Sequence, residues 1–289
     1  MFLEVFYFTQ VALIPVLIQE FHLSLLEVSL VATVPSLISL LANVPSGLLA
    51  DRLSANRLLF ASMMIEGISI LMVSQTHSYW VLILALCFTR AASPLYHTSG
   101  LSQITKIAES DKLNMAMGLH NAFGDLGTAV GVASLAVFLS ILNWRWAYIF
   151  WAVPILIWGA VVLMSSQLKT TRLERKRIED TRHLKSLSPI LYSAFLVFLV
   201  SIGARELGST AISTFMTTYL VRTADLSGST ASLIFSLGAF VGIVGSLAGG
   251  YLGQRMGVKK AMSVTILASA ASLSALAFVS HLYVLTLLY

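Results

Sequence analysis

The chain has 289 residues and a formal net charge of +5; 57% of its residues are apolar and only 11% are charged. A soluble domain usually carries about 45–50% apolar and about 25% charged residues, so this chain has too few polar groups to cover a water-soluble globule. The composition argues against a soluble enzyme, a nucleic-acid-binding domain and a disordered chain, and it predicts a polytopic protein of the lipid bilayer.

Long apolar runs follow one another along the chain from its first residue. Because a helix needs about 20 apolar residues to cross the hydrocarbon core, we predict about nine complete membrane spans and part of a tenth. The tenth starts near Leu282 and continues to Tyr289. The complete spans are predicted at residues 1–20, 25–50, 57–75, 79–104, 113–141, 144–167, 188–221, 229–253 and 259–280.

The lysines and arginines indicate how the chain is oriented. If the N-terminus is cytoplasmic, 14 of the 18 basic residues fall in inner loops, and only Arg145 and Arg222 fall in outer loops. Cytoplasmic loops of membrane proteins carry an excess of Lys and Arg. We therefore predict a multi-pass protein of the cell membrane with a cytoplasmic N-terminus.

Two loops share one sequence pattern. Residues 47–57, after the second span, and residues 250–260, after the eighth, both begin with glycine, end in basic residues and lie 203 residues apart. Matched segments of this kind are typical of internally repeated transporters. We therefore expect a six-span half at residues 1–167, a cytoplasmic linker at 168–187 and an incomplete second half at 188–289, as in a fragment of a twelve-span protein.

Residues 47–57 resemble the signature loop of the major facilitator superfamily, with Asp51 at the matching position and Ser54 where the family has glycine. Arg90 matches the arginine that opens the family's span-four motif, and residues 144–147 resemble its turn between spans five and six. The resemblance implies the major facilitator fold, an all-α integral membrane fold with two six-helix halves. A narrower resemblance, to the fosmidomycin-resistance group of exporters, depends on residues 93–97 and on Arg205 with residues 214–220.

Asp125 is the most isolated charge within a predicted span, near the middle of span five. A charged side chain at the centre of a membrane costs about 2.5–3.5 kcal/mol on insertion scales, so its presence favours a function. One interpretation is that Asp125 binds a proton or substrate during transport. The alternative is a fixed hydrogen bond, or an ion pair with Arg90 or Arg205. Glu66 and Glu4 are weaker candidates, and Glu4 lies close enough to the cytoplasmic end to be solvated.

Four further residues inside predicted spans are candidates for substrate binding or proton coupling. Arg90 stays protonated, so it can hold an anion or a carboxylate, and the family resemblance implies such a role. His97 lies about two helical turns further on and shares the face of Arg90, although packing is the common role of a lone histidine. Arg205 and Glu206 are adjacent and pair poorly with each other on a helix, so we predict that Arg205 reaches a central cavity.

Two sets of residues are assigned to conformational roles. Asp51 is predicted to act as a latch, because a carboxylate at the cytoplasmic mouth can cap or pair in one state and release in the other; a solvated loop acid is the alternative. Glycine stripes in spans five and eight are predicted to let these helices approach closely. The latch comprises Gly47, Asp51, Arg52, Arg57 and Arg255, and the stripes comprise Gly124, Gly127, Gly131, Gly238, Gly242 and Gly245.

The sequence lacks the common motifs of metal and nucleotide chemistry. Its single cysteine, Cys87, excludes an intrachain disulfide and a paired-cysteine metal site, and no HExxH, GxSxG or Walker-type loop occurs. We expect no enzyme activity, no metal and no cofactor, with energy drawn from the proton gradient.

These features predict an antiporter that exports a small organic compound by alternating access, with protons, the substrate and the bilayer as partners, no nucleic acid, and a monomeric state. Val132 stands where the family's antiporter motif has proline, which counts against antiport. An importer of a small anionic metabolite is the nearest alternative, favoured if Arg90 and Arg205 face the cavity unpaired. A non-transporting receptor, scaffold or truncated remnant is the third interpretation.

Overall fold

The computed structural model describes residues 2–109, 111–166 and 189–276, and these residues form helices and no β-strand. This confirms the all-α class. The predicted linker and the predicted tenth span lie outside the described residues. The helices are η1 (Phe2–Glu4), α1 (Val5–Ala12), α2 (Ile14–Phe21), α3 (Leu25–Arg52), α4 (Ala55–Gln75), α5 (Tyr79–Ile107), α6 (Leu113–Ile141), α7 (Trp144–Ser166), α9 (Pro189–Thr223), α10 (Gly228–Met256) and α11 (Val258–Leu276).

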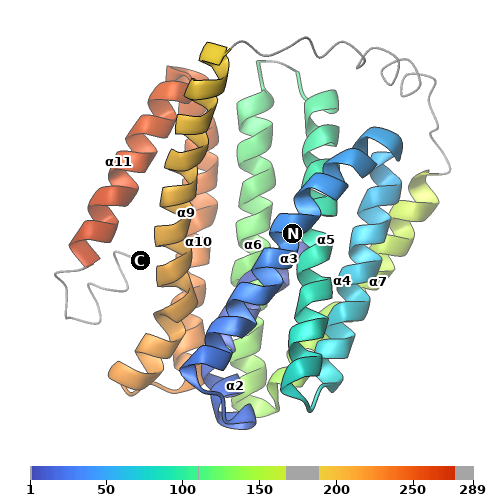
Figure 1. Cartoon of the computed structure of the whole chain (residues 1–289), viewed down its shortest axis with the longest axis vertical. Coiled ribbons are helices and arrows are strands. Elements are labelled where there is room, and N and C mark those ends of the chain that lie inside the picture. Colours follow the sequence, from blue (N-terminus) through green and yellow to red (C-terminus); the bar gives the residue numbers. More distant parts are fainter. Residues whose placement is uncertain (1, 110, 167–188, 277–289) are drawn as a thin grey trace.

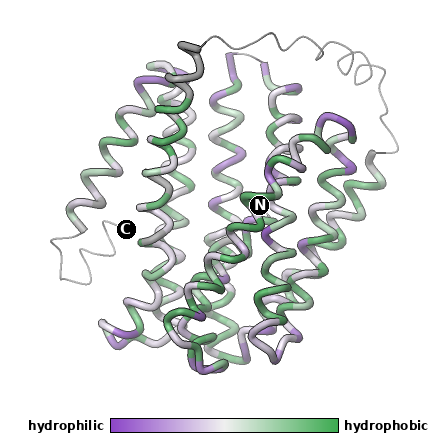
Figure 2. The backbone as a smooth tube through the Cα atoms, viewed as in Figure 1, coloured by the Kyte–Doolittle hydropathy of each residue, from purple (hydrophilic) through white to green (hydrophobic). Residues whose placement is uncertain are grey.

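Six of the described helices are long and apolar enough to cross a membrane. Figure 2 shows that hydrophobic residues dominate the length of the helices, while hydrophilic residues gather mostly toward the two ends of the bundle. This distribution is the one that a hydrocarbon layer with water on both sides requires. The six helices are α3, α4, α5, α6, α7 over Trp144–Met164, and α10.

The first predicted span, residues 1–20, is divided in two at Leu13, which corrects the prediction of one continuous helix. Pro15 stands in the first turn of α2, and it has no N–H to donate to the carbonyl of Val11 one turn earlier. The hydroxyl of Thr217, on α9, donates to that carbonyl at 3.2 Å. A backbone oxygen left without its helical donor is therefore satisfied by a side chain from the second half of the chain.

Matching caps begin the two helices that precede the repeated loops. Ser24 and Glu27 form a capping box at the start of α3, in which each side chain accepts a hydrogen bond from the other residue's backbone N–H. Ser227 begins α10 and accepts a hydrogen bond from the backbone N–H of Thr230 at 3.1 Å. The two serines lie 203 residues apart, the same offset that separates the repeated loops.

The helices lie in two groups on either side of α6 (Figure 1). On one side α9, α10 and α11 stand together; on the other side lie α3, α4, α5 and α7. The α6–α10 pair makes the most extensive contact between any two described helices, and α4 packs against both α5 and α7. We call the α6–α10 contact the seam. The Arg145 end of the bundle holds the α6–α7 turn, and the Asp51 end is the opposite one.

Candidate functional site

A cluster of charged residues lies inside the group of helices on the α5 side of the seam. Glu4 from η1, Glu66 from α4 and Arg90 from α5 line one cavity of about 20 Å³, which is room for about one water molecule. The cavity is too small for an organic substrate, but it suits a proton carried on a side chain or on water. Its other lining residues are Leu3, Phe6, Thr89, Ser93 and Tyr96.

The charges in this cluster compensate one another. The side chain of Glu66 belongs to a residue that is only 3% exposed, and it interacts electrostatically with Arg90 and with Glu4. Ionised groups inside a membrane protein persist where an opposite charge lies nearby. Arg90 therefore shares its surroundings with two acidic side chains, Glu4 and Glu66.

His97 extends the cluster toward its open side. Its Nε2 lies 3.3 Å from Oε1 of Glu4, with the two side chains 45% and 19% exposed. The ring of Tyr96 lies between two histidines, with centroids 5.2 Å from His97 and 6.0 Å from His120 on α6. Thus Glu4 connects a deep carboxylate–arginine cavity with a more accessible imidazole.

The interpretation of Glu4 as a solvated acid near the cytoplasmic end is wrong, because the structure pairs it with His97 and places it beside Glu66 and Arg90. An isolated acid in an apolar run requires a partner inside the protein, and that signal was present in the sequence for both Glu4 and Glu66. The sequence placed His97 on the same helix face as Arg90. In the structure Glu4 lies next to both, because it pairs with His97 and lines the same cavity as Arg90.

Asp125 lies on the seam instead of in this cluster. Its Oδ2 accepts a hydrogen bond of 2.5 Å from the hydroxyl of Ser246 on α10. Gly242, one turn before Ser246, faces the same carboxylate, since a Cβ on Gly242 would lie 3.4 Å from Cγ of Asp125. The structural interpretation of Asp125 as a fixed hydrogen-bonding group describes this geometry, with Ser246 as the donor.

The seam is closest at two glycines that the sequence analysis did not select. A Cβ on Gly118 would lie 2.8 Å from the carbonyl oxygen of Ser246 and 3.0 Å from Cα of Gly250. Within the predicted stripe of span five, Gly131 faces Val5 of α1 and Gly124 faces Glu4. This part of the stripe therefore packs against the first span.

The other stripe residues have varied surroundings. Gly127 is buried within α6, whereas Gly238 on α10 is only partly buried. Gly245 has open space where a Cβ would point. Gly242 on α10 contacts α6 through Asp125.

The predicted latch residues lie at the Asp51 end. Asp51, Arg52 and Arg57 are exposed, and a Cβ on Gly47 would meet no atom within 4 Å. Arg255 is also exposed, and its guanidinium lies 5.2 Å from the ring centroid of Tyr251. The role of these residues as a conformational latch therefore stays a prediction.

Gln254, the neighbour of Arg255, also contacts the other side of the seam at this end. Gln254 stands where the first copy of the repeat has Asp51, and its Nε2 donates a 2.9 Å hydrogen bond to the backbone carbonyl of Asp111. A carboxylate at this position has no proton to donate to a carbonyl. The difference between the two copies therefore has a physical reason.

Arg205 and Glu206 belong to α9. Their side chains lie outside the part of the chain that the structure describes. The assignment of Arg205 to a central cavity thus stays a prediction, as does the candidate role of Glu206 in substrate binding or proton coupling.

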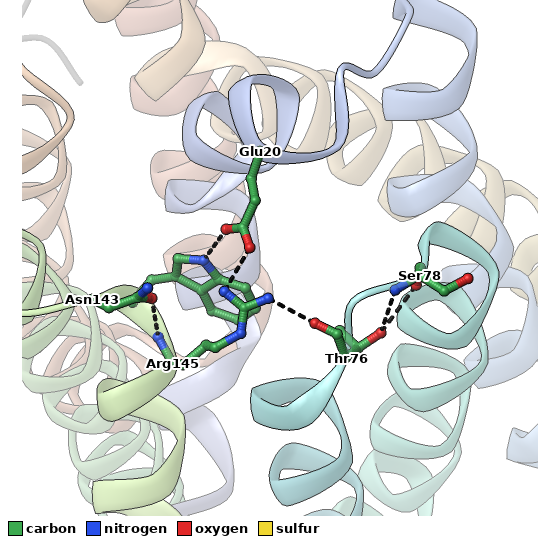
Figure 3. A network of polar contacts seen from close by, with 6 residues as sticks. Glu20, Thr76, Ser78, Asn143 and Arg145 are labelled. Carbon is green, nitrogen blue, oxygen red and sulfur yellow. Dashed lines mark hydrogen bonds and ion pairs between the residues drawn. The ribbon is translucent and has the colours of Figure 1, made fainter.

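A second polar network lies at the Arg145 end of the bundle (Figure 3). Nη1 of Arg145 lies 2.6 Å from Oε1 of Glu20, and its Nη2 donates to the carbonyl of Thr76 at 2.7 Å. The indole N–H of Trp144 donates to the other oxygen of Glu20 at 2.5 Å. The network joins α2, the α4–α5 turn and α7. The sequence signal was an arginine predicted in an outer loop together with Glu20, an acid at the outer end of the first predicted span.

A helical bundle with ionisable groups held inside its apolar body has the organisation of a membrane transporter. Residues 1–289 match the family model described as Major Facilitator Superfamily, and the chain belongs to that family.

Curated relatives in bacteria are transporters by name. The "Probable nitrate transporter NarT" of Staphylococcus carnosus is 24% identical over 257 residues, 88% of this chain and 64% of its own length. The "Nitrite extrusion protein" of Bacillus subtilis is 24% identical over 82% of this chain and 58% of its own length. The "Probable sugar efflux transporter" of Pasteurella multocida is 24% identical over 79% and 59%. The chain therefore spans about two thirds or less of the length of these relatives.

A solved structure with the same fold is a bacterial homologue of the human lysosomal transporter Spinster, in an inward-facing and unoccupied conformation. It aligns with a TM-score of 0.63 at 18% identity and covers 99% of this chain and 69% of the other. The likeness shows the shared fold. The narrower resemblance to fosmidomycin-resistance exporters stays a prediction.

Proposed function

We propose that this chain is a proton-coupled secondary-active transporter that exports a small organic compound by alternating access between two halves. We place it in the cell membrane as a monomer with a cytoplasmic N-terminus. The observation that carries the proposal is the pairing of Glu4 with His97 at the edge of the Glu66–Arg90 cavity.

The cluster contains the parts that proton coupling needs. An imidazole and a carboxylate can each bind and release a proton, and Nε2 of His97 lies 3.3 Å from Oε1 of Glu4, close enough for direct proton transfer between them. The groups that face this pair are Glu66 and Arg90, with the rings of Tyr96 and His120 alongside. Protonation of Glu4 would release His97, and the change in charge would reach Arg90 through the shared cavity.

Export is supported by the names of two relatives, which refer to nitrite extrusion and sugar efflux. A second candidate is transport of a small inorganic anion, because the names of other relatives refer to nitrate. Against an anion site at Arg90 stands the presence of Glu4 and Glu66 in the same cavity. The two candidates differ in cargo, and one assay separates them.

The test is proton flux in inside-out vesicles that contain the full-length gene product, challenged with organic compounds, sugars, nitrate and nitrite. We expect at least one organic compound to drive proton release from the vesicles. Glu4→Gln and His97→Asn should abolish this release. The matched control is Glu109→Gln, since the Glu109 side chain is 68% exposed on a loop.

A response to nitrate or nitrite alone would replace the organic cargo with an anion. Proton release that persists undiminished in both Glu4→Gln and His97→Asn would remove the assigned coupling pair. If no compound changes proton flux relative to empty vesicles, proton-coupled export is wrong.

A further inference from the structure

Asp125 has a specific place on the seam. Its carboxylate lies against the bare face of Gly242 and accepts a hydrogen bond from Ser246. A longer side chain at position 242 would displace the carboxylate, because even a Cβ there would lie 3.4 Å from Cγ of Asp125. The α10 helix thus provides both the space and the donor for this one acid of α6.

Two further contacts across the seam use small residues and backbone. Near the Arg145 end the hydroxyl of Ser229 donates to the carbonyl of Ala136 at 2.9 Å. Toward the Asp51 end Gly118 and Gly250 meet backbone to backbone. Small residues let two membrane helices approach closely, but smooth surfaces do not by themselves fix how far one helix is shifted along the other. A directional hydrogen bond between two side chains fixes this shift.

We infer that Asp125 is a positioning residue, which sets the register of α10 on α6 through the hydrogen bond from Ser246, and that it does not carry the transported proton. The inference rests on the proposed function in one respect, since it concerns the surface along which the two halves move. Asp125 belongs to the seam, whereas Glu4 lines the cavity on the other side of α6 and His97 pairs with Glu4 at the edge of that cavity.

The two roles of Asp125 predict opposite behaviour for one substitution. An asparagine keeps the carbonyl oxygen that accepts from Ser246 but cannot bind and release a proton. A positioning role is therefore rescued by Asp125→Asn and lost in Asp125→Ala. A proton-carrying role is lost in both variants. Ser246→Ala removes only the donor, so it should reproduce Asp125→Ala if the hydrogen bond is what matters.

The register of the seam can be measured without transport. An ideal Cβ on Gly253 lies 3.8 Å from Cβ of Asn114, within the range of about 3.5–4.5 Å that a disulfide requires. The experiment uses the full-length gene product with Cys87→Ser, Asn114→Cys and Gly253→Cys. Cross-linking is started in native membranes with copper–phenanthroline and followed over time. Asn114 lies about three helical turns from Asp125, so the new cysteines leave the tested hydrogen bond untouched.

We expect Asp125→Ala and Ser246→Ala each to slow cross-linking about tenfold, the factor that one lost hydrogen bond to a charged group is worth. The combination of the two should be no slower than either alone. Asp125→Asn should stay within about twofold of the parent and should retain compound-driven proton release. The inference is overturned if Asp125→Asn cross-links as slowly as Asp125→Ala, if Ser246→Ala cross-links at the parent rate, or if Asp125→Asn loses proton release.

Failure of the proposed function is recognised separately. If the parent protein releases no protons with any compound, proton-coupled export fails, while the cross-linking rates still decide the positioning role. If proton release is present and Glu4→Gln abolishes it, the assignment of Glu4 and His97 as the coupling pair is supported. This conclusion does not depend on the cross-linking rates.

Discussion

Gly118 and Gly250 lie back to back where α6 crosses α10, at a point where neither helix has room for a side chain. A Cβ on Gly118 would lie 3.0 Å from Cα of Gly250, and a Cβ on Gly250 would lie 3.1 Å from Cα of Gly118 and 2.9 Å from the carbonyl oxygen of Asn114. The atoms that would be met belong to backbone, which cannot rotate away as a side chain can. The two helices must therefore separate to admit even a methyl group.

Gly250→Ala is expected to destabilise the protein, because overpacking of a close contact costs about 1–3 kcal/mol. The matched control is Gly249→Ala, one residue earlier on α10, where a Cβ would meet no atom within 4 Å. Alanine also favours a helix over glycine, so the control should be neutral or slightly stabilising. The measurement is the midpoint of thermal unfolding of the detergent-solubilised protein. Equal midpoints for the two variants would contradict the close backbone contact.

Gln254→Glu is expected to weaken the seam at the Asp51 end more than Gln254→Ala does. The glutamate has nearly the same shape, but it replaces the N–H that donates to the carbonyl of Asp111 with a negatively charged oxygen. Alanine merely removes the donor and leaves the exposed carbonyl to water. We expect the Asn114→Cys and Gly253→Cys pair to cross-link about threefold more slowly with glutamate at position 254. A glutamate variant that matches the parent would show that this hydrogen bond does not hold the seam.

Glu20→Gln is expected to lower the free energy of unfolding by about 2 kcal/mol, since it weakens hydrogen bonds to a charged partner that is mostly buried. The Arg145 side chain is 16% exposed and has Glu20 as its acidic partner in the network of Figure 3. Glu109→Gln serves as the control, because its ion pair with Lys112 joins side chains that are 68% and 66% exposed. Exposed pairs of that kind contribute about 0–1 kcal/mol. Thermal midpoints in detergent should fall for Glu20→Gln and change little for Glu109→Gln; the reverse order would refute the network's role.

The sequence alone predicted the helices better than their contacts. Hydropathy reports the length and apolarity of a segment, and on that basis six of the predicted spans coincide with the long apolar helices α3, α4, α5, α6, α7 and α10. Pro15 stood in the printed sequence, yet the apolar run around it concealed the division of the first span at Leu13. A run that is uniformly apolar gives no periodic signal, so hydropathy does not reveal where a helix breaks or which face it turns toward its neighbour.

The candidate site shows the same limit. Asp125 was identified because a charged side chain in the middle of a membrane span is energetically unfavourable. Its partner Ser246 could not be identified in the same way, because it is 121 residues away and is one of many serines in the predicted spans. Gly131 was assigned to a glycine stripe, and its rotation toward Val5 of α1 follows from tertiary packing that a single sequence does not contain. The role of Glu4 was underestimated because its position close to the cytoplasmic end of a span suggested that water solvates it. A single sequence does not show that Glu4 pairs with His97.

The pairing of Arg145 with Glu20 has an electrical consequence. Moving one elementary charge through a membrane potential involves about 2.3 kcal/mol for each 100 mV that it crosses. The two side chains are in contact and carry opposite charges, so they move through the field as a neutral unit. A displacement of this pair along the membrane normal is thus nearly independent of the membrane voltage.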